Sequence, residues 1–285
     1  MESDGAIQQA HSLRLDRPRR VSPERERSGF AALSWRIHLA VVGALVALSA
    51  IAWVRTVNDA RSMSGMVMGL GQVGSLAAGS MGAGIFLAMW AVMMAAMMLP
   101  TVAPMVLAHL AIARRRGGGY FPTIVFVVGY LAVWFASGVP PYFAYVWLSR
   151  LAAEAAQSRW LPVLAGSILV FAGTYQFTGW KQLCLDKCQS PFAFILTHDF
   201  DGGVRSALRA GVWHGVFCLG CCWALMIVLL VVGVMNLAWM IGLFLVFLVE
   251  KSWRHGLLLA RVAGAALVVL GVMVIVDPTL LPRIS

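Results

Sequence analysis

The chain has 285 residues, of which 60% are hydrophobic and only 12% are charged, and its mean hydropathy is +0.82. A soluble globular domain carries about twice that share of charge, so the composition excludes an ordinary soluble protein. Lys and Arg number 22 against 12 acidic residues. In a membrane protein an excess of basic residues indicates how the chain is oriented in the membrane, and it is not by itself a sign of nucleic-acid binding. No nucleic-acid partner is expected.

The first 36 residues are polar, rich in Arg and without hydrophobic periodicity, which predicts a disordered cytoplasmic tail. Residues 37–285 are expected to form one membrane domain, because apolar runs near the roughly 20 residues that a spanning helix needs recur along them. There are seven such runs, at about 37–54, 82–107, 121–147, 161–178, 207–233, 238–250 and 260–276. The expected fold is all-α: a polytopic membrane protein with about seven transmembrane helices in one bundle.

The basic residues predict how this bundle lies in the membrane. If the N-terminus is inside, 17 of the 22 basic residues fall on the inner side and five on the outer side. Since Lys and Arg accumulate in cytoplasmic loops, we expect a cytoplasmic N-terminus and an outer C-terminus. The loop at 179–206 is then cytoplasmic, and membrane lipids are the expected surroundings. The sequence leaves the oligomeric state open.

The fifth apolar run contains the most informative chemistry, a histidine and three cysteines within nine residues. At 100° per residue, Cys218, Cys221 and Cys222 share with His214 an arc of about 100° over two turns of helix. Thiolates are soft ligands that select ions such as Cu(I) or Zn(II). Cysteines also serve as small packing residues, but three of them with a histidine on one arc favour a metal site.

A second pair of cysteines, Cys184 and Cys188, lies in the predicted cytoplasmic loop. If the fourth helix continues past the membrane, the spacing of four places both thiols on one helical face. This spacing is a weaker metal signal than paired Cys-x-x-Cys motifs. His198, Asp199 and Asp201 downstream are harder donors, for which a solvated loop is a sufficient explanation.

A methionine stripe on the second apolar run is the third candidate. Met89, Met93 and Met97 recur at every fourth residue, with Met94 and Met98 beside them. Core filling explains a methionine stripe by itself. However, thioethers bind Cu(I) without losing a proton, and this stripe reaches the inner end of its helix at a depth similar to that of the histidine–cysteine arc. The sequence therefore adds Met89, Met93 and Met97 to the candidate ligands.

These motifs resemble those of the DUF2182 family of prokaryotic integral membrane proteins. The resemblance rests on Met-x-x-x-Met-Met-x-x-Met-Met-x-Pro at 89–100, Cys-Leu-x-x-Cys-x-x-Pro at 184–191, His-Gly-x-x-Cys-x-Gly-Cys-Cys-Trp at 214–223, and Glu250-Lys251. It covers about residues 80–260. It implies a metal-binding protein of the inner (plasma) membrane. The Glu250-Lys251 pair closes the sixth run at its inner end, where a carboxylate either has a function or lies among lipid headgroups.

Three functional hypotheses follow from these motifs. The leading one is a membrane protein that binds a soft transition metal, copper or alternatively zinc, in trafficking or homeostasis, with a metal-donor or metal-acceptor protein as partner. The second is a thiol–disulfide redox protein that uses Cys218/Cys221 and Cys184/Cys188, although the predicted topology places both pairs on the reducing side. The third is a small-molecule or ion transporter with structural cysteines, which usually has ionisable residues at mid-membrane that this sequence hardly offers. No motif of a conventional enzyme is present.

Overall fold

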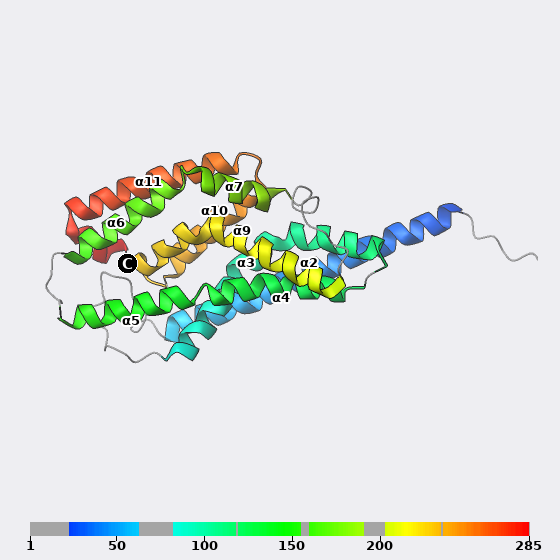
Figure 1. Ribbon diagram of the computed structural model, residues 1–285, viewed down its shortest axis with the longest axis horizontal. Coiled ribbons are helices and arrows are strands. Elements are labelled where there is room, and N and C mark those ends of the chain that lie inside the picture. The colour runs from blue at the N-terminus through cyan, green and yellow to red at the C-terminus, as the bar shows by residue number, and fades with distance from the viewer. Residues whose placement is uncertain are drawn as a thin grey trace, which may run out of the picture. The chain divides into compact units, whose positions relative to one another are not determined.

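The computed structural model of the protein describes residues 23–62, 82–117, 119–154, 160–190, 203–234 and 236–284. These residues form helices and contain no strand. In chain order the elements are α2 (Pro23–Ser62), α3 (Ala83–Arg115), α4 (Phe121–Ala136), α5 (Val139–Glu154), α6 (Trp160–Tyr175), α7 (Gly179–Gln189), α9 (Gly203–Val232), α10 (Leu237–Ser252), α11 (Gly256–Val276), the 3₁₀ turn η2 (Pro278–Leu280) and α12 (Leu281–Ile284) (Figure 1). The all-α prediction is confirmed.

Five helical segments of the described chain are long and apolar enough to cross a membrane. They are Leu39–Arg61, Ala83–Arg115, Phe121–Trp147, Gly203–Val232 and Gly256–Val276. The pair α6 and α7 forms one further candidate, bent by 61° at the break between the two helices. Six of the seven predicted runs therefore correspond to a candidate span.

The seventh run, predicted at 238–250, is helix α10. It has 16 residues and would extend about 24 Å at 1.5 Å per residue. That is short of the roughly 30 Å hydrocarbon core, so α10 does not have the length of a regular spanning helix. The prediction of a short element directly after the fifth span is confirmed, since only residues 233–236 separate α9 from α10.

Helix α2 begins at Pro23, inside the stretch that the sequence predicts to be a disordered tail. Residues 1–22 lie outside the described part of the chain, so their disorder stays a prediction. The chain divides into two compact units, residues 1–43 and 44–285. The fold and the site described below belong to the second unit.

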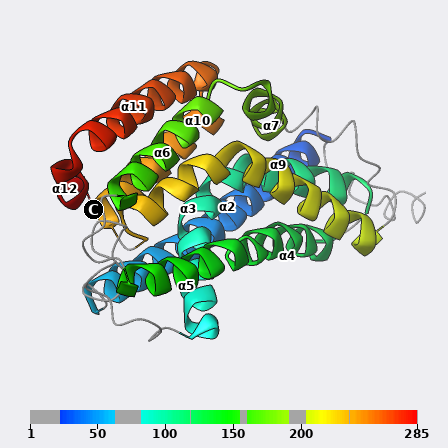
Figure 2. The same ribbon diagram turned by 60° about the vertical axis from the view of Figure 1, so that its left-hand side comes forward.

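Glycines allow two pairs of helices to approach closely, as is common among membrane helices. Between α6 and α11 the contacts are reciprocal, because a Cβ at Gly166 would lie 2.5 Å from the Gly271 carbonyl oxygen and one at Gly173 would lie 2.6 Å from that of Gly264. Between α4 and α9, a Cβ at Gly211 would overlap the backbone of α4. Both views show α6 beside α11 and α4 beside α9 (Figures 1 and 2).

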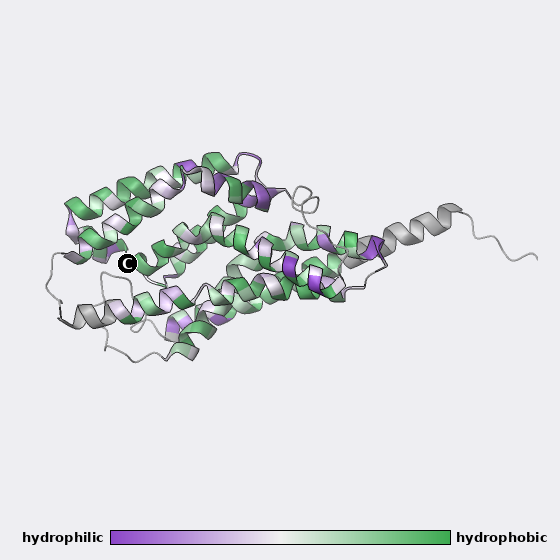
Figure 3. Ribbon diagram, in the orientation of Figure 1, coloured by the Kyte–Doolittle hydropathy of each residue, from purple (hydrophilic) through white to green (hydrophobic). Residues whose placement is uncertain are grey.

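The outer surface of the helices is apolar. The exposed large hydrophobic side chains on α11 are Leu258, Val262, Val269, Val272, Met273, Ile275 and Val276. Figure 3 shows hydrophobic residues along the length of the helices, while hydrophilic residues gather on α7 and near helix ends. A soluble protein rarely exposes contiguous apolar surface of this extent, so the exterior is compatible with a multi-pass membrane protein.

Candidate metal centre

The middle of α9 turns its cysteines into the protein. Cys218, Cys221 and Cys222 are all buried, with relative exposures of 1%, 0% and 0%. The arc that the residue spacing predicts therefore faces the interior rather than lipid. Gly211 and Gly215 on the same helix let α4 pack closely against it, which closes this part of the bundle around the thiols.

Helix α7 supplies a fourth thiol. The chain bends after α6, and the Thr178 side chain caps α7 by accepting a hydrogen bond from the Lys181 backbone N–H at 3.3 Å. The cap directs α7 back along α9, with Lys181 and Leu185 on its buried side. One turn after Leu185, Cys188 lies with its Sγ 3.8 Å from the Cys221 Sγ.

The four thiols of Cys188, Cys218, Cys221 and Cys222 form one group, which we call the thiol cluster. The Sγ atoms of Cys221 and Cys222 lie 3.4 Å apart. Cys218 is buried one turn before Cys221 and Cys222 on the same face of α9. The Cys221 thiol also donates to the Cys218 carbonyl oxygen at 3.1 Å. Four soft donors from two helices thus lie close together, three of them buried and Cys188 half-buried.

The end of α10 brings a cation to this cluster. The Lys251 ammonium donates to the Cys218 Sγ at 3.0 Å and to the Thr101 hydroxyl at 3.2 Å, and its Nζ lies 3.8 Å from the Met98 sulfur. The Tyr130 hydroxyl and the Cys218 Sγ share a hydrogen bond of 3.1 Å. Cys218 therefore contacts α4 through Tyr130 and α10 through Lys251. Lys251 in turn contacts α3 through Thr101 and Met98.

A buried ion pair fixes α7 in place. The Lys181 ammonium donates to the Glu250 carboxylate at 2.8 Å and to the Cys221 carbonyl at 2.7 Å. The Gln189 amide donates to the carbonyl oxygens of Glu250 and Trp253. Lys181 belongs to the stretch 179–206 that is predicted to be a cytoplasmic loop. It is nevertheless fully buried, because α7 packs against the bundle.

Two of the predicted ligands lie beside the cluster. The His214 ring is buried one turn before Cys218, with ring centroids 6.0 Å from Phe126 and 5.8 Å from Tyr130. The Cys184 thiol packs against α9 at Gly220, where a Cβ would lie 2.7 Å from its sulfur. The i, i+4 spacing predicts only that both cysteines of α7 share one helical face. In the structure both thiols contact α9, Cys184 at Gly220 and Cys188 at Cys221.

The predicted methionines Met89, Met93 and Met97 are buried on α3. The methionine whose sulfur lies near the Lys251 ammonium is Met98, one position further along the same helix. The candidates at 198–201 lie outside the described residues.

The thiol cluster is close-packed but is not a finished metal site. Within the described ranges, no three His, Cys, Asp or Glu side chains are arranged so that they could hold a metal ion as they stand. The cluster instead combines soft sulfur donors with a lysine ammonium bonded to one of them. This arrangement can bind a soft cation after local adjustment, or it can form a disulfide.

Comparison with protein families identifies one family that matches this chain. The family described as PpoB2, copper chaperone, matches residues 87–274. This range covers well over half of the chain and contains the whole thiol cluster. The chain belongs to the PpoB2 copper chaperone family. Comparisons with curated proteins and with solved structures found no match.

Membership in the copper chaperone family associates the function of the chain with copper. The family that matches is the PpoB2 copper chaperone family. The sequence motifs alone suggest a resemblance to a family of another name, DUF2182. Every ligand candidate named from the sequence falls inside the matched range.

Several groups around the cluster escape the sequence analysis. Thr101 and Tyr130 belong to apolar helices and carry no spacing signal that separates them from core residues, and Met98 stands out only as a neighbour of the methionine stripe. Lys251 is visible in the sequence, but a lysine at a helix end normally extends to the headgroups. Only the packing of α10 against α3 reveals that its ammonium points inward.

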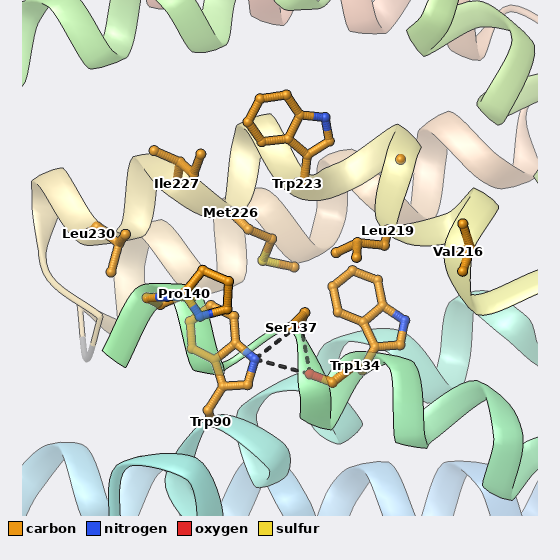
Figure 4. Close-up of a pocket in the computed structure, with 12 residues that line it drawn as sticks. Trp90, Trp134, Ser137, Pro140, Val216, Leu219, Trp223, Met226, Ile227 and Leu230 are labelled. Carbon is orange, nitrogen blue, oxygen red and sulfur yellow. Dashed lines mark hydrogen bonds between the residues drawn. The ribbon is translucent and has the colours of Figure 1, made fainter. Parts of the chain in front are cut away.

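The opposite face of α9 lines an apolar cavity of about 420 Å³ (Figure 4). Trp90, Trp134 and Trp223 contribute to its wall, and the Trp90 indole N–H donates to the Trp134 carbonyl at 3.2 Å and lies 3.4 Å from the Ser137 hydroxyl. None of the residues that line this cavity is a cysteine, a histidine or a charged residue. In a copper chaperone, this face offers no soft donor except the Met226 sulfur.

Proposed function

We propose that this protein is a multi-pass membrane copper chaperone and that the thiol cluster holds its cargo, Cu(I). The observation that carries the proposal is the meeting of Cys188 from α7 with Cys221 of α9, whose sulfurs lie 3.8 Å apart. The sulfur of Cys222 lies a further 3.4 Å from that of Cys221. Soft thiolates select Cu(I) among the available metals. Membership in the copper chaperone family supports copper over zinc as the cargo.

The surroundings of the cluster support a cation site. An anionic thiolate in a low-dielectric interior is stabilised only when a cation lies nearby, and the cluster already has one in Lys251. His214, Cys184 and the stripe of Met89, Met93 and Met97 are further candidate donors, expected to contribute less than the four cluster thiols. A chaperone has to receive copper and pass it on, so we infer a metal-donor or metal-acceptor protein as partner.

The predicted topology places the cluster at the cytoplasmic side of a prokaryotic inner membrane. Support comes from the charge distribution, with 17 of 22 basic residues on the proposed inner side. Single cysteines introduced at Arg115 and at Gln157 of a cysteine-free variant should react with an impermeant thiol reagent from opposite sides. Reaction of both from one side would contradict the topology.

The copper site is tested by a competition titration against a Cu(I) chelator with purified protein. Replacing Cys218 or Cys221 with Ser should lower the Cu(I) affinity about a hundredfold or more, because loss of a direct ligand should cost at least as much as the 10–100-fold typical of outer-shell changes. Serine is a hard, poorly ionised donor and cannot replace a thiolate.

The matched control in this titration is Met89→Leu. It preserves side-chain volume and removes one weak ligand at most, so the affinity should change much less. If both serine variants bind copper as tightly as the wild type, the proposed site does not exist in this form.

The 3.8 Å between the sulfurs of Cys188 and Cys221 also suits a second function, a thiol–disulfide exchange protein. Oxidation of this pair would form one S–S bond and release two protons and two electrons to an acceptor of higher potential. Differential alkylation followed by mass spectrometry of protein isolated under thiol quench separates the two functions. A stable population of this disulfide in cells would favour redox exchange over copper binding.

A further inference from the structure

The ammonium group of Lys251 occupies an unusual place for a lysine at a helix end. Its side chain is half-buried, and the next three residues of the chain are exposed. A lysine so placed normally extends its ammonium toward water. Lys251 instead turns inward and donates to Cys218 and Thr101.

The partners of the ammonium are those of a soft cation rather than those of a structural lysine. Two of the three nearest groups are sulfur atoms, the Cys218 Sγ at 3.0 Å and the Met98 Sδ at 3.8 Å. The one carboxylate close by, Glu250, is paired with Lys181. Lys251 is therefore held by sulfur and hydroxyl groups, and it marks the point of the cluster that accepts a positive charge.

A buried charge in a low-dielectric site is expensive without a counter-charge. One monovalent cation can leave such a site at low cost when another takes its place, because the net charge of the site is unchanged. Two cations against the same thiolate repel each other, so one thiolate in an apolar site favours one close cation at a time. Since the stem of Lys251 is already half-exposed, rotation of the side chain can return its ammonium to the adjoining exposed turn.

We propose that Lys251 is an exchangeable counter-cation of the copper site: its ammonium lies against Cys218 and Met98 when the cluster is free of copper, and it withdraws when Cu(I) binds there. Met98 then becomes available as a thioether ligand next to Cys218. When copper leaves, Lys251 returns, so that the cluster is never left without a cation. This inference rests on the proposed copper-binding function and assigns Lys251 a positioning role.

The sequence makes this exchange easy to follow chemically, because the chain contains only three lysines, Lys181, Lys187 and Lys251. The full-length protein is treated with an amine-acetylating reagent, with and without Cu(I), under anaerobic conditions, and each lysine is quantified by peptide mass spectrometry. We expect the acetylation rate of Lys251 to rise about tenfold on Cu(I) loading, as loss of a charge-assisted hydrogen bond allows. Lys187, which is half-exposed, and Lys181, which is buried in its ion pair, serve as internal controls that should not change.

A kinetic measurement separates this role from simple packing. In Lys251→Leu, transfer of Cu(I) to a soluble chelator should slow about tenfold, since no internal cation returns to the cluster. A merely structural lysine would give the opposite result, because loss of packing loosens the site and speeds release. Arg254→Leu, which removes an exposed cation three residues away, should leave the transfer rate unchanged.

The outcomes distinguish the two levels of the hypothesis. If Cu(I) binding depends on Cys221 but the acetylation rate of Lys251 is unchanged or reduced on Cu(I) loading, the exchange is overturned. The proposed copper site would still hold. Faster transfer of Cu(I) from Lys251→Leu than from the wild type would also overturn the exchange without contradicting the copper site. Failure of the wild-type protein to bind Cu(I) at all overturns both the exchange and the proposed function.

Discussion

The two faces of α9 differ sharply, although most of the helix is apolar. One face carries the thiols and meets the ammonium groups of Lys181 and Lys251, which come from α7 and α10. The other face lines the tryptophan-walled cavity and meets no charged residue there. Among the described residues, the lysine ammonium groups that contact this part of α9 thus lie on its thiol face, and no charged residue lines its cavity face.

This segregation follows from the cost of charge in an apolar medium. Ionisable groups at membrane level persist only when they pair with each other or with backbone carbonyls. Lys181 does both, through Glu250 and the Cys221 carbonyl. Gathering all such groups on one side of α9 lets each satisfy another, and it leaves the cavity side free of them.

The largest expected effect concerns the ion pair that fixes α7 on the thiol face. In Glu250→Gln the buried Lys181 ammonium loses its counter-charge, and we expect the free energy of unfolding to fall by about 3–5 kcal/mol. Thermal unfolding of the purified protein in detergent, followed by tryptophan fluorescence, measures the change. In the double variant Lys181→Leu/Glu250→Leu most of the stability should return, because no charge remains unpaired. A single variant as stable as the wild type would contradict the role of this pair.

The next effect compares the two cysteines of α7. Cys188→Ser removes a thiol of the cluster and should lower the Cu(I) affinity by about a hundredfold. Cys184→Ser, one turn away on the same helix, alters a thiol that packs against Gly220. The Cu(I) affinity of this variant should change by less than about threefold, because Cys184 packs against Gly220 and not against a sulfur of the cluster. The same chelator competition measures the Cu(I) affinity of both variants. Equal losses of affinity would contradict the assignment of Cys188, and not Cys184, to the thiol cluster.

The smallest effect belongs to the cavity face. Leu219 lies between Cys218 and Cys221 in sequence, but it lines the cavity on the far side of the helix. Leu219→Ala should leave the Cu(I) affinity within about twofold of the wild type, as expected for sites without shared partners. A loss as large as that of Cys188→Ser would mean that the two faces are not independent.

Local spacing predicts the part of this site that lies on one helix. The arc of Cys218, Cys221 and Cys222 needs only the helical period, and the structure turns it inward as a buried face. The same reasoning selects Met89, Met93 and Met97 because they repeat regularly. Which methionine lies near Lys251 depends on how α3 is rotated toward α10, and there the structure places Met98.

Contacts between distant segments lie beyond such reasoning. Cys188 meets Cys221 across 33 residues of chain, after a bend that Thr178 caps and the Lys181–Glu250 pair holds. No local pattern contains that information. The hydropathy runs predict the helices well, including the short one that forms α10, but they do not reveal that α7 packs back on the bundle.

The central claim is that copper is held by the sulfurs of the thiol cluster. X-ray absorption spectroscopy at the copper edge of the Cu(I)-loaded protein tests it most directly. The account predicts a first coordination shell made of sulfur, at distances of about 2.3 Å as in other metal–thiolate sites. A first shell dominated by nitrogen or oxygen would contradict it, since copper would then be bound away from the four cysteines.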